Sequence, residues 1–505
     1  MSGRIGRRAF LGRAMAGMGA AALAGCGAGG PLPAGSGSTL ESTWGDPTGD
    51  GRLRVLAGEP LIARAELSAP AADVGVLATF AHLTDAHVLD ASSPARVPFL
   101  RRLGPPFTST FRPQESLTAQ VLEGALTAVR ALGAELVVQG GDLLDNDQGN
   151  ELSQARSVLA GGIVTPGSGP HRYYGVQLAS DPDPFYYRPD VDAPRHPGLL
   201  QAAVRPFLAR GLGLPWVPVL GDHDILVAGE LVPTPVTRAL AVGDRALWEL
   251  PPGLTLPPGF RLQATSSPDG PPAPGSVHEF LIRALAGPTV RVPVDLTRRQ
   301  LTAGEVVAEL RTAAAPTSTR TGDRLDYAVD VGERVRLIVL DLARRGGGSG
   351  GLVVAGQPAW LAGQLAQAGG QWLIIVSHQP LAESAAGGEL LSLLDRSPQV
   401  LATLCGHTHR NRIAPRATAA GGYWQIETAS LIDYPQQARA LRIVATAGGG
   451  VAIRTWMLDH VGYGPLGRIS RELAYLDAEG GRPQGFGGGR LDRNVVLYRR
   501  AAVRS

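Results

Sequence analysis

Five short apolar segments of this chain each end in a cluster of polar residues rich in histidine and aspartate, and this pattern restricts the fold more than any other feature. Runs of Val, Ile and Leu that stop at Gly and polar residues are typical of buried strands that end in a loop. In open α/β sheets, ligands bind at the carboxyl ends of the strands, so the five clusters are expected to converge. The segments are 76–80, 136–138, 216–220, 372–376 and 400–404, and the clusters after them are 82–87, 140–145, 221–224, 377–380 and 405–409.

Helices are predicted between these strands, and together the two kinds of element predict an α/β fold. The helical segments are 114–132, 199–210 and 357–367. A second sheet is also predicted, with a hairpin of Tyr327–Val331 and Arg334–Asp341 around Gly332-Glu333. Its other strands, which alternate like antiparallel strands, are 421–426, 440–445 and 451–457.

The five clusters combine imidazole and carboxylate groups, a donor set that suits Zn²⁺, Mn²⁺ or iron but not Ca²⁺ or an iron–sulfur cluster. The pairs Asp85-x-His87 and His407-x-His409 direct both side chains to one side of an extended chain. One such pair would be weak support, since a lone His at a strand end is more often structural. Five clusters in series predict a metal centre.

The order of the clusters resembles the motifs of the calcineurin-like metallophosphoesterases, of the bacterial exported phosphodiesterase and phosphatase type. The family's motifs run Asp-x-His, Gly-Asp-x-x-Asp, Gly-Asn-His-Asp/Glu, His and Gly-His-x-His. Between residues 76 and 410 this chain has, in the same order, Asp85-x-His87, Gly141-Asp142-x-x-Asp145, Gly221-Asp222-His223-Asp224, His378 and Gly406-His407-x-His409. The resemblance implies a four-layer α/β/β/α sandwich of two mixed sheets, with insertions. It also implies two divalent or mixed-valence transition metal ions (Mn, Zn or Fe), bridged by Asp142. The implied ligands are Asp85, His87 and His409 for one ion, and Asp222, His378 and His407 for the other.

The activity that this resemblance implies is hydrolysis of a small-molecule phosphodiester or phosphomonoester by a hydroxide that bridges the metals. His223 falls on the catalytic histidine of the family, and Asp145 on the carboxylate that orients it. The alternative is a surface lipoprotein that binds metal without turnover. An oriented imidazole that is not a ligand favours the enzyme, because a storage site does not need one.

Position 222 departs from the family pattern, since it holds Asp where the family has Asn. The second metal would gain a charged ligand, and the centre would carry one positive charge fewer. Such a centre should tolerate trivalent iron better and attract a phosphate dianion less.

Two neighbours of the expected site are less informative. His82 precedes Asp85 by an odd number of positions, so that it should face away from the site and act structurally. Asp224 is either an acceptor that supports the site or a turn residue.

The first 26 residues have the three parts of an export signal. Arg7-Arg8-Ala9-Phe10-Leu11 resembles the twin-arginine signal, and Leu23-Ala24-Gly25-Cys26 resembles a lipobox, which implies a lipid on Cys26 that anchors the chain to the membrane. A plain export signal with an incidental cysteine is the alternative. The predicted location is therefore the cell surface, the periplasm or the extracellular space.

The remaining organisation is predicted as a flexible tether over 27–70, a catalytic domain over 71–460 and a C-terminal extension over 461–505. Insertions are expected at about 146–198 and 225–325. Aromatics beside arginines at 171–174 and 185–188 could stack on a base or sugar, or could pack the insertion onto the core.

The composition and charge of the chain argue against binding of duplex nucleic acid and against one class of catalysis. The formal charge of +3 includes four arginines of the export signal, and the basic residues, all of them arginine, form no stripe for duplex nucleic acid. The absence of lysine excludes Schiff-base chemistry. No protein partner is predicted.

Overall fold

The computed structural model describes most of the chain from residue 37 onward. The predicted export signal and residues 27–36 of the predicted tether lie outside the described residues. None of the helices formed by the described residues has the length and hydrophobicity that a membrane crossing requires. The described residues are 37–103, 110–255, 280, 283–284, 286–313, 316–320, 322–478, 480–481 and 485–500.

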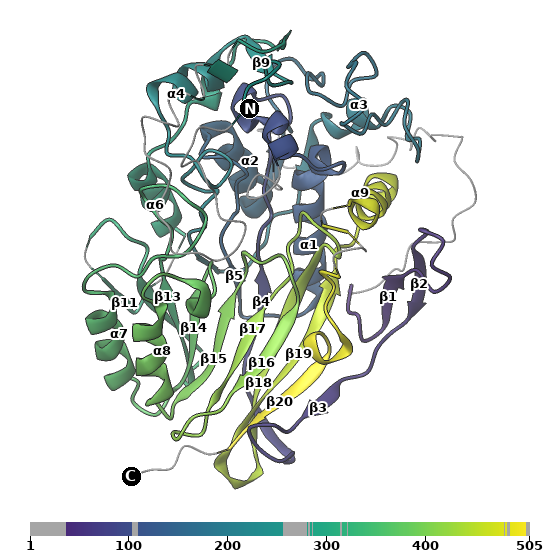
Figure 1. The fold of residues 1–505 in the computed structure, drawn as a ribbon. Coiled ribbons are helices and arrows are strands. Elements are labelled where there is room, and N and C mark those ends of the chain that lie inside the picture. The colour runs from purple at the N-terminus through teal and green to yellow at the C-terminus, as the bar shows by residue number, and fades with distance from the viewer. Residues whose placement is uncertain are drawn as a thin grey trace, which may run out of the picture. The chain divides into compact units, whose positions relative to one another are not determined.

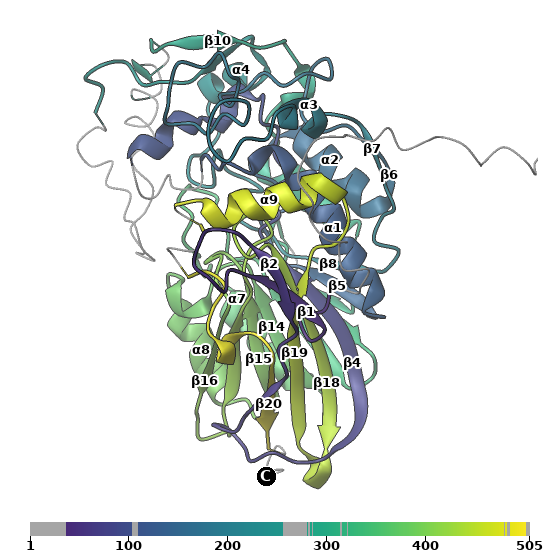
Figure 2. The same cartoon turned by 90° about the vertical axis from the view of Figure 1, so that its right-hand side faces the viewer.

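The first of two seven-stranded sheets contains three of the five strands that precede the polar clusters. In this sheet β4 lies between β5 and β18, parallel to β5 and antiparallel to β18. Figure 2 shows β4, β18, β19 and β20 side by side. The order is β3 (Ile62–Arg64), β20 (Val495–Arg499), β19 (Val451–Asp459), β18 (Gln437–Thr446), β4 (Asp73–Leu83), β5 (Leu136–Gln139) and β8 (Trp216–Pro218).

The second sheet contains the other two of these strands, β14 and β15, which run parallel to each other and to β13 and β17. The antiparallel pairs β12–β13 and β16–β17 make this sheet mixed as well. The order is β11 (Ser318–Thr319), β12 (Tyr327–Val331), β13 (Val335–Leu340), β14 (Trp372–Ser377), β15 (Val400–Cys405), β17 (Tyr423–Glu427) and β16 (Arg412–Arg416).

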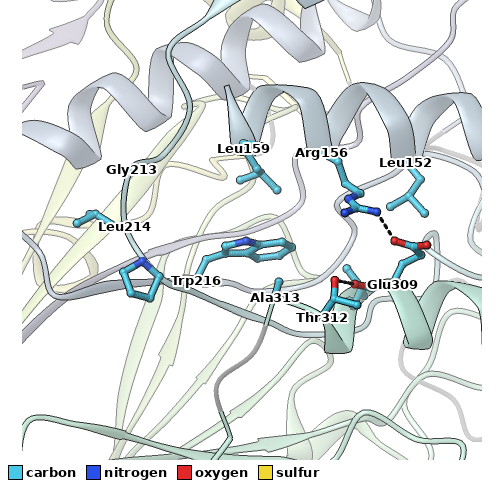
Figure 3. Close-up of a pocket in the computed structure, with 12 residues that line it drawn as sticks. Leu152, Arg156, Leu159, Gly213, Leu214, Trp216, Glu309, Thr312 and Ala313 are labelled. Atoms are coloured by element: carbon cyan, nitrogen blue, oxygen red, sulfur yellow. Dashed lines mark hydrogen bonds and ion pairs between the residues drawn. The ribbon is translucent and has the colours of Figure 1, made fainter. Parts of the chain in front are cut away.

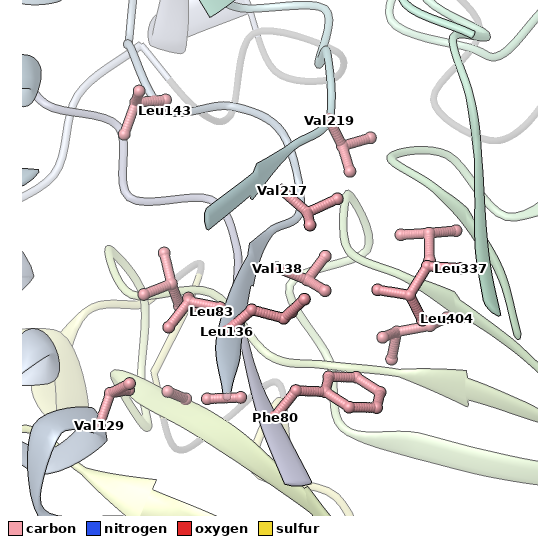
Figure 4. Packing of buried hydrophobic residues seen from close by; sticks show 14 of the residues in the cluster. Phe80, Leu83, Val129, Leu136, Val138, Leu143, Val217, Val219, Leu337 and Leu404 are labelled. Carbon is pink, nitrogen blue, oxygen red and sulfur yellow. The ribbon is translucent and has the colours of Figure 1, made fainter. Parts of the chain in front are cut away.

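The main hydrophobic core lies between the two sheets and continues to the helices that cover the first sheet. Phe80 and Val138 of the first sheet belong to the same buried cluster as Leu337 and Leu404 of the second (Figure 4). Along β13 and β14 consecutive residues alternate between this cluster and a second one on the outer face, as the two-residue period of a strand requires.

Helices cover the outer faces of both sheets. Leu361 of α7 (Gln357–Ala366) and Leu390 of α8 (Gly387–Asp395) join the outer cluster of the second sheet, beside which both helices lie in Figure 1. The apolar side of α1 (Thr118–Ala131) packs on β18 and β19 of the first sheet. The layers are therefore helices, sheet, sheet and helices, which confirms the predicted α/β sandwich of two mixed sheets.

Several predicted elements differ from the structure. The strands predicted at 440–445 and 451–457 belong to the first sheet, because β18 pairs with β4, and β17 is parallel to β15. The helix predicted over 199–210 ends at Ala203, because Pro206 cannot continue it and residues 207–209 pair as a strand with residues 162–164. Residues 42–64, predicted as part of a flexible tether, form three strands, one of which pairs with β20.

The regions predicted as insertions contain short elements of their own, and two of their helices contribute to the main core. Leu152, Ala155 and Val158 of α2 are part of the main core, so α2 is a covering helix of the fold. The first region contains α2 (Gly149–Ala160) and β6 (Gly162–Val164), and the second contains α4 (Pro235–Val242), β9 (Arg245–Leu247), β10 (Thr289–Arg291) and α6 (Ala303–Arg311). Outside these regions lie β1 (Ser42–Gly45), β2 (Arg54–Ala57), α3 (Leu199–Ala203), β7 (Phe207–Ala209) and α9 (Gly464–Leu476).

The aromatic residues of the first predicted insertion are mainly structural. Tyr186 is fully buried, and its hydroxyl donates to the carbonyl of Trp248 at 2.9 Å. Its ring packs edge-on against Phe111, with ring centroids 5.0 Å apart. Tyr173 is also buried, and its hydroxyl accepts from the N–H of Gln177. These contacts favour packing over base stacking.

Candidate metal centre

The loops after β4, β5, β8, β14 and β15 bring all seven predicted ligands together at the carboxyl ends of their strands. Three overlapping sets have donor atoms that all lie within 4.8 Å of one another. The sets are Asp85, His87 and His409; Asp142, Asp222, His378 and His407; and His87, Asp142 and His223. The first two sets match the division between two ions that the family resemblance implies.

The first set is held together by short contacts between imidazole and carboxylate groups. Nε2 of His409 lies 3.2 Å from Oδ1 of Asp85 and 3.4 Å from Nε2 of His87. The carboxylate of Asp85 also accepts from Oγ1 of Thr84 at 2.7 Å. Three donor atoms therefore converge on one point.

The second set converges on Oδ1 of Asp222. This oxygen lies 3.3 Å from Nε2 of His378 and 3.3 Å from Nδ1 of His407. Nε2 of His378 is also 3.1 Å from Oδ2 of Asp142.

Asp142 faces both sets. Its Oδ2 is 3.1 Å from Nε2 of His378 in the second set and 3.7 Å from Nε2 of His87 in the first. Its Oδ1 accepts the main-chain N–H of His223 at 2.9 Å, which fixes the carboxylate between the two sets. This is the position that a bridging ligand requires.

The donor set fits transition metal ions. Asp85, Asp142 and Asp222 are at most 2% exposed, and three buried carboxylates side by side need positive charge nearby. Nε2 of His378 is buried without a hydrogen bond, although carboxylate oxygens lie close to it. A metal ion would satisfy both the nitrogen and the oxygens.

In three of the histidines the ring nitrogen that faces away from the centre has a partner of its own. Such partners select the tautomer that leaves the other nitrogen for a metal. Nδ1 of His87 lies 3.1 Å from Oδ1 of Asp145, Nδ1 of His378 lies 2.8 Å from the carbonyl of Gly140, and Nδ1 of His409 lies 2.5 Å from Oδ2 of Asp433.

The pKa values show how strongly the centre attracts positive charge. Burial would lower the pKa of His409, but Asp85 and the hydrogen bond with Asp433 raise it to about 9. Burial also opposes protonation of His378, yet the charges of Asp142 and Asp85 raise its pKa well above the ordinary value. His378 and His409 therefore bind protons when no metal ion is present, whereas burial lowers the pKa of His87 well below its ordinary value.

The backbone of the centre is strained at five of the seven predicted ligands. Their φ angles lie in the left-handed region, which is uncommon for residues with a side chain and concentrates at functional sites. The angles are 53° for Asp85, 43° for His87, 47° for Asp142, 65° for His407 and 56° for His409.

Glycines beside the ligands leave room that a side chain would fill. A Cβ at Gly221 would lie 2.0 Å from Oδ1 of Asp142, and a Cβ at Gly406 would lie 2.5 Å from Oδ2 of Asp85. The Gly before His or Asp in these motifs is therefore needed for close approach to the neighbouring ligand.

The structure corrects the expected partner of His223. Nδ1 of His223 lies 2.7 Å from the main-chain carbonyl of Asp145, whereas the carboxylate of Asp145 is 3.9 Å away. The carboxylate is instead held by His87, whose Nδ1 is closer to it. Asp145 thus supports both histidines, with different atoms. His223 also has a donor atom within reach of His87 and Asp142, so geometry alone allows it to be a ligand.

Other residues near the centre have supporting positions. His82 is fully buried, and its Nδ1 is 2.8 Å from Oγ1 of Thr428, as expected of a structural residue. Asp224 accepts the main-chain N–H groups of Leu144 and Gly221, so it ties two ligand loops together.

Sequence reasoning missed two residues that contact the ligands. Asp433 contacts His409, and Nε2 of Gln379 donates to Oδ1 of Asp222 at 3.0 Å. Gln379 could have been noticed as the neighbour of His378, but Asp433 lies beyond β17 and outside every motif.

The centre opens to solvent on one side. The side chains of His407 and His409 are 23% and 12% exposed, whereas those of His87 and His378 are fully buried.

A separate pocket of about 550 Å³ lies at the other end of β8, between α2 and α6 (Figure 3). Trp216, Leu159 and the ion pair of Arg156 with Glu309 line this pocket, which contains none of the predicted site residues.

No family model and no curated protein matches the chain. Among solved structures it is similar to a dimetal phosphatase from Danio rerio, with 13% sequence identity and a TM-score of 0.38. The alignment covers 76% of this chain and 100% of that chain.

Proposed function

We propose that this chain is a phosphoesterase that uses two transition metal ions. The observation that carries the proposal is the position of Asp142 between two sets of buried His and Asp donors, with His223 beside them. Asp85, His87 and His409 would hold one ion, and Asp222, His378 and His407 the other. Two ions bound this way activate water and neutralise phosphoryl oxygens.

His223 would move a proton in this reaction. The carbonyl of Asp145 accepts from Nδ1–H, which fixes the tautomer in which Nε2 has no proton before it accepts one. Burial opposes protonation of His223, but the charges of Asp142 and Asp145 raise its pKa above the ordinary value, which favours the imidazolium with a proton on Nε2. In this protonated form the ring can stabilise negative charge on the substrate and give the Nε2 proton to the leaving oxygen. A chain that only stores metal has no use for such a group.

The predicted export signal over residues 1–26 supports export of the chain and its attachment to a membrane through a lipid on Cys26. Fractionation of cells tests this location, and recovery of the chain with soluble cytoplasmic proteins would contradict it.

The decisive experiment combines metal analysis with turnover. We expect the metal-free chain, once reconstituted with Mn²⁺, Zn²⁺ or iron, to bind two ions and to hydrolyse chromogenic nitrophenyl monoesters or diesters. Two bound ions without turnover of either ester class would support the metal-binding lipoprotein instead. One ion or none, with the fold intact, would contradict both the centre and the activity.

A further inference from the structure

We propose that Asp433 and Gln379 are positioning residues for different metal ions, Asp433 for the ion of the first set and Gln379 for the ion of the second. The inference rests on the proposed function in so far as it requires two ions. Asp433 lies outside the five polar clusters, and Gln379 follows the ligand His378 in the fourth cluster.

Asp433 orients His409. Its Oδ2 accepts from Nδ1 of His409 at 2.5 Å, so that Nε2 of this histidine points to Oδ1 of Asp85. The carboxylate cannot easily rotate, because Nε of Arg112 donates to its Oδ1 at 2.6 Å. Its backbone is held as well, since the N–H of Asp433 donates to Oγ of Ser430. A carboxylate behind a ligating imidazole fixes the ring and raises its basicity.

Gln379 orients Asp222. Its Nε2 donates to Oδ1 of Asp222 at 3.0 Å and to the carbonyl of Ser349 at 3.1 Å, and its side chain is buried. The same Oδ1 faces His378 and His407, so the amide holds the oxygen on which the second set converges. A neutral donor achieves this without removing the negative charge that attracts the ion.

Asp433 contacts a ligand of the first set and Gln379 contacts a ligand of the second. This separation makes the proposal testable. Losing either one should weaken one ion selectively, whereas general damage to the fold would weaken both. Removal of a supporting contact of this kind typically costs about 10- to 100-fold in metal affinity.

The test titrates the metal-free full chain with Mn²⁺, following heat by calorimetry and the ions by electron paramagnetic resonance. The variants are Asp433→Asn, Asp433→Ala and Gln379→Met, the last of which keeps the volume but removes the donor. In each we expect one ion to bind with unchanged affinity and the other about 10- to 100-fold more weakly. The spectrum at low Mn²⁺ should then show isolated ions in place of a coupled pair.

Matched controls measure the cost of the substitutions themselves. Gln364→Met removes a buried amide that donates to Ser318. Asp395→Asn removes a carboxylate at the end of α8 that accepts from Arg416. Both controls should bind two Mn²⁺ ions like the unaltered chain. Asp433→Asn keeps an oxygen for Arg112, so it is the variant to use if Asp433→Ala does not fold.

Double variants identify which ion is affected. Adding Asp433→Asn to His409→Ala should cause no further loss of affinity, because the residue through which Asp433 acts is already gone. Adding it to Asp222→Ala should still weaken the remaining ion. For Gln379→Met the expectation is reversed. Adding it to Asp222→Ala should cause no further loss of affinity, and adding it to His409→Ala should weaken the remaining ion.

Equal weakening of both ions by either variant would overturn the proposal, and so would full additivity of Asp433→Asn with His409→Ala. If the unaltered chain binds no Mn²⁺, Zn²⁺ or iron, both this inference and the proposed function are wrong. If the unaltered chain binds two ions and only the selectivity is missing, the proposed function stands and this inference alone is wrong.

Discussion

The role of His223 is tested by removing its imidazole. We expect His223→Ala to lower kcat by about 10²- to 10⁴-fold, the usual effect of losing a general acid or base, with two metal ions still bound. Metal analysis of the same sample separates this role from that of a ligand, which the distance to His87 and Asp142 also permits. Loss of an ion from this variant would make His223 a ligand.

We expect the charge of Asp222 to affect the choice of substrate in the proposed phosphoesterase. With Asp in place of Asn at this position a two-metal centre would have one positive charge fewer, and a diester monoanion would lose less attraction than a monoester dianion. Asp222→Asn should therefore lower the ratio of kcat/KM for diesters to that for monoesters. The two forms must be compared at equal measured metal content. An unchanged or higher ratio would contradict the electrostatic argument.

Metal binding should depend on pH through His409, whose pKa Asp85 and Asp433 raise to about 9 despite its burial. A metal ion must displace the proton, so affinity should fall by up to about tenfold per pH unit below that pKa, for each proton displaced. Calorimetric titrations between pH 6 and 10, in buffers with different ionisation enthalpies, would count the protons released. Affinity that does not change with pH would contradict this prediction.

Protonation of His409 weakens metal binding, but it stabilises the folded state of the metal-free chain. A folded pKa above the ordinary value of 6.5 stabilises the fold fully below about pH 6.5. This contribution is lost as the pH rises through about 9.

At the scale of the loops, the glycine before Asp222 sets how closely two strand ends approach. Gly221→Ala would place a methyl group 2.0 Å from Oδ1 and 2.3 Å from the main-chain N of Asp142, so the bridging carboxylate must move. We expect both metal ions to be lost or strongly weakened. Gly363→Ala in α7 is the matched control, since a Cβ there meets nothing within 4 Å and alanine favours a helix. It should bind both ions, and a Gly221→Ala chain that also does so would contradict the argument.

Much of the fold could be predicted because each strand that carries a ligand is marked twice, by its apolar residues and by the polar cluster that follows. The hairpin of β12 and β13 was predicted for the same kind of reason, since Gly332 lies between two alternating segments with φ of 61°. The seven candidate ligands could be chosen from spacing and from family resemblance. Their assembly at one place was then expected from parallel strands.

Other features are not encoded in any local pattern. Pairing of β18 with β4 joins segments more than 350 residues apart, and the alternation of β18 is the same whichever sheet it joins. The contact of Asp433 with His409 likewise depends on the path of the chain after β17. The partner of Nδ1 in His223 is a main-chain carbonyl, which no residue type can indicate.

Across the whole molecule, the two ions would join the sheets. Asp85, His87, Asp142 and Asp222 follow strands of the first sheet, whereas His378, His407 and His409 follow strands of the second. Chelation should therefore lower the thermal unfolding midpoint of the whole sandwich. For a two-state transition, each site contributes about 2.7 kcal/mol at a free metal concentration 100 times its Kd.

Calorimetric scans with and without chelator, followed by addition of Mn²⁺, would measure this effect. The midpoint should recover when metal is restored. An unchanged midpoint in a chain shown to have lost both ions would mean that the ions do not stabilise the fold.

The order of the strands also sets when the centre can form during synthesis. Asp85 is made early, yet β4 lies between β5 and β18, and the last ligand and its partner Asp433 come more than 300 residues later. A chain still attached to the ribosome at residue 400 has neither His407 nor His409. Neither set of ligands is therefore complete before His407 and His409 have been made, and the metals available where the chain folds after that point would decide which ions the protein receives.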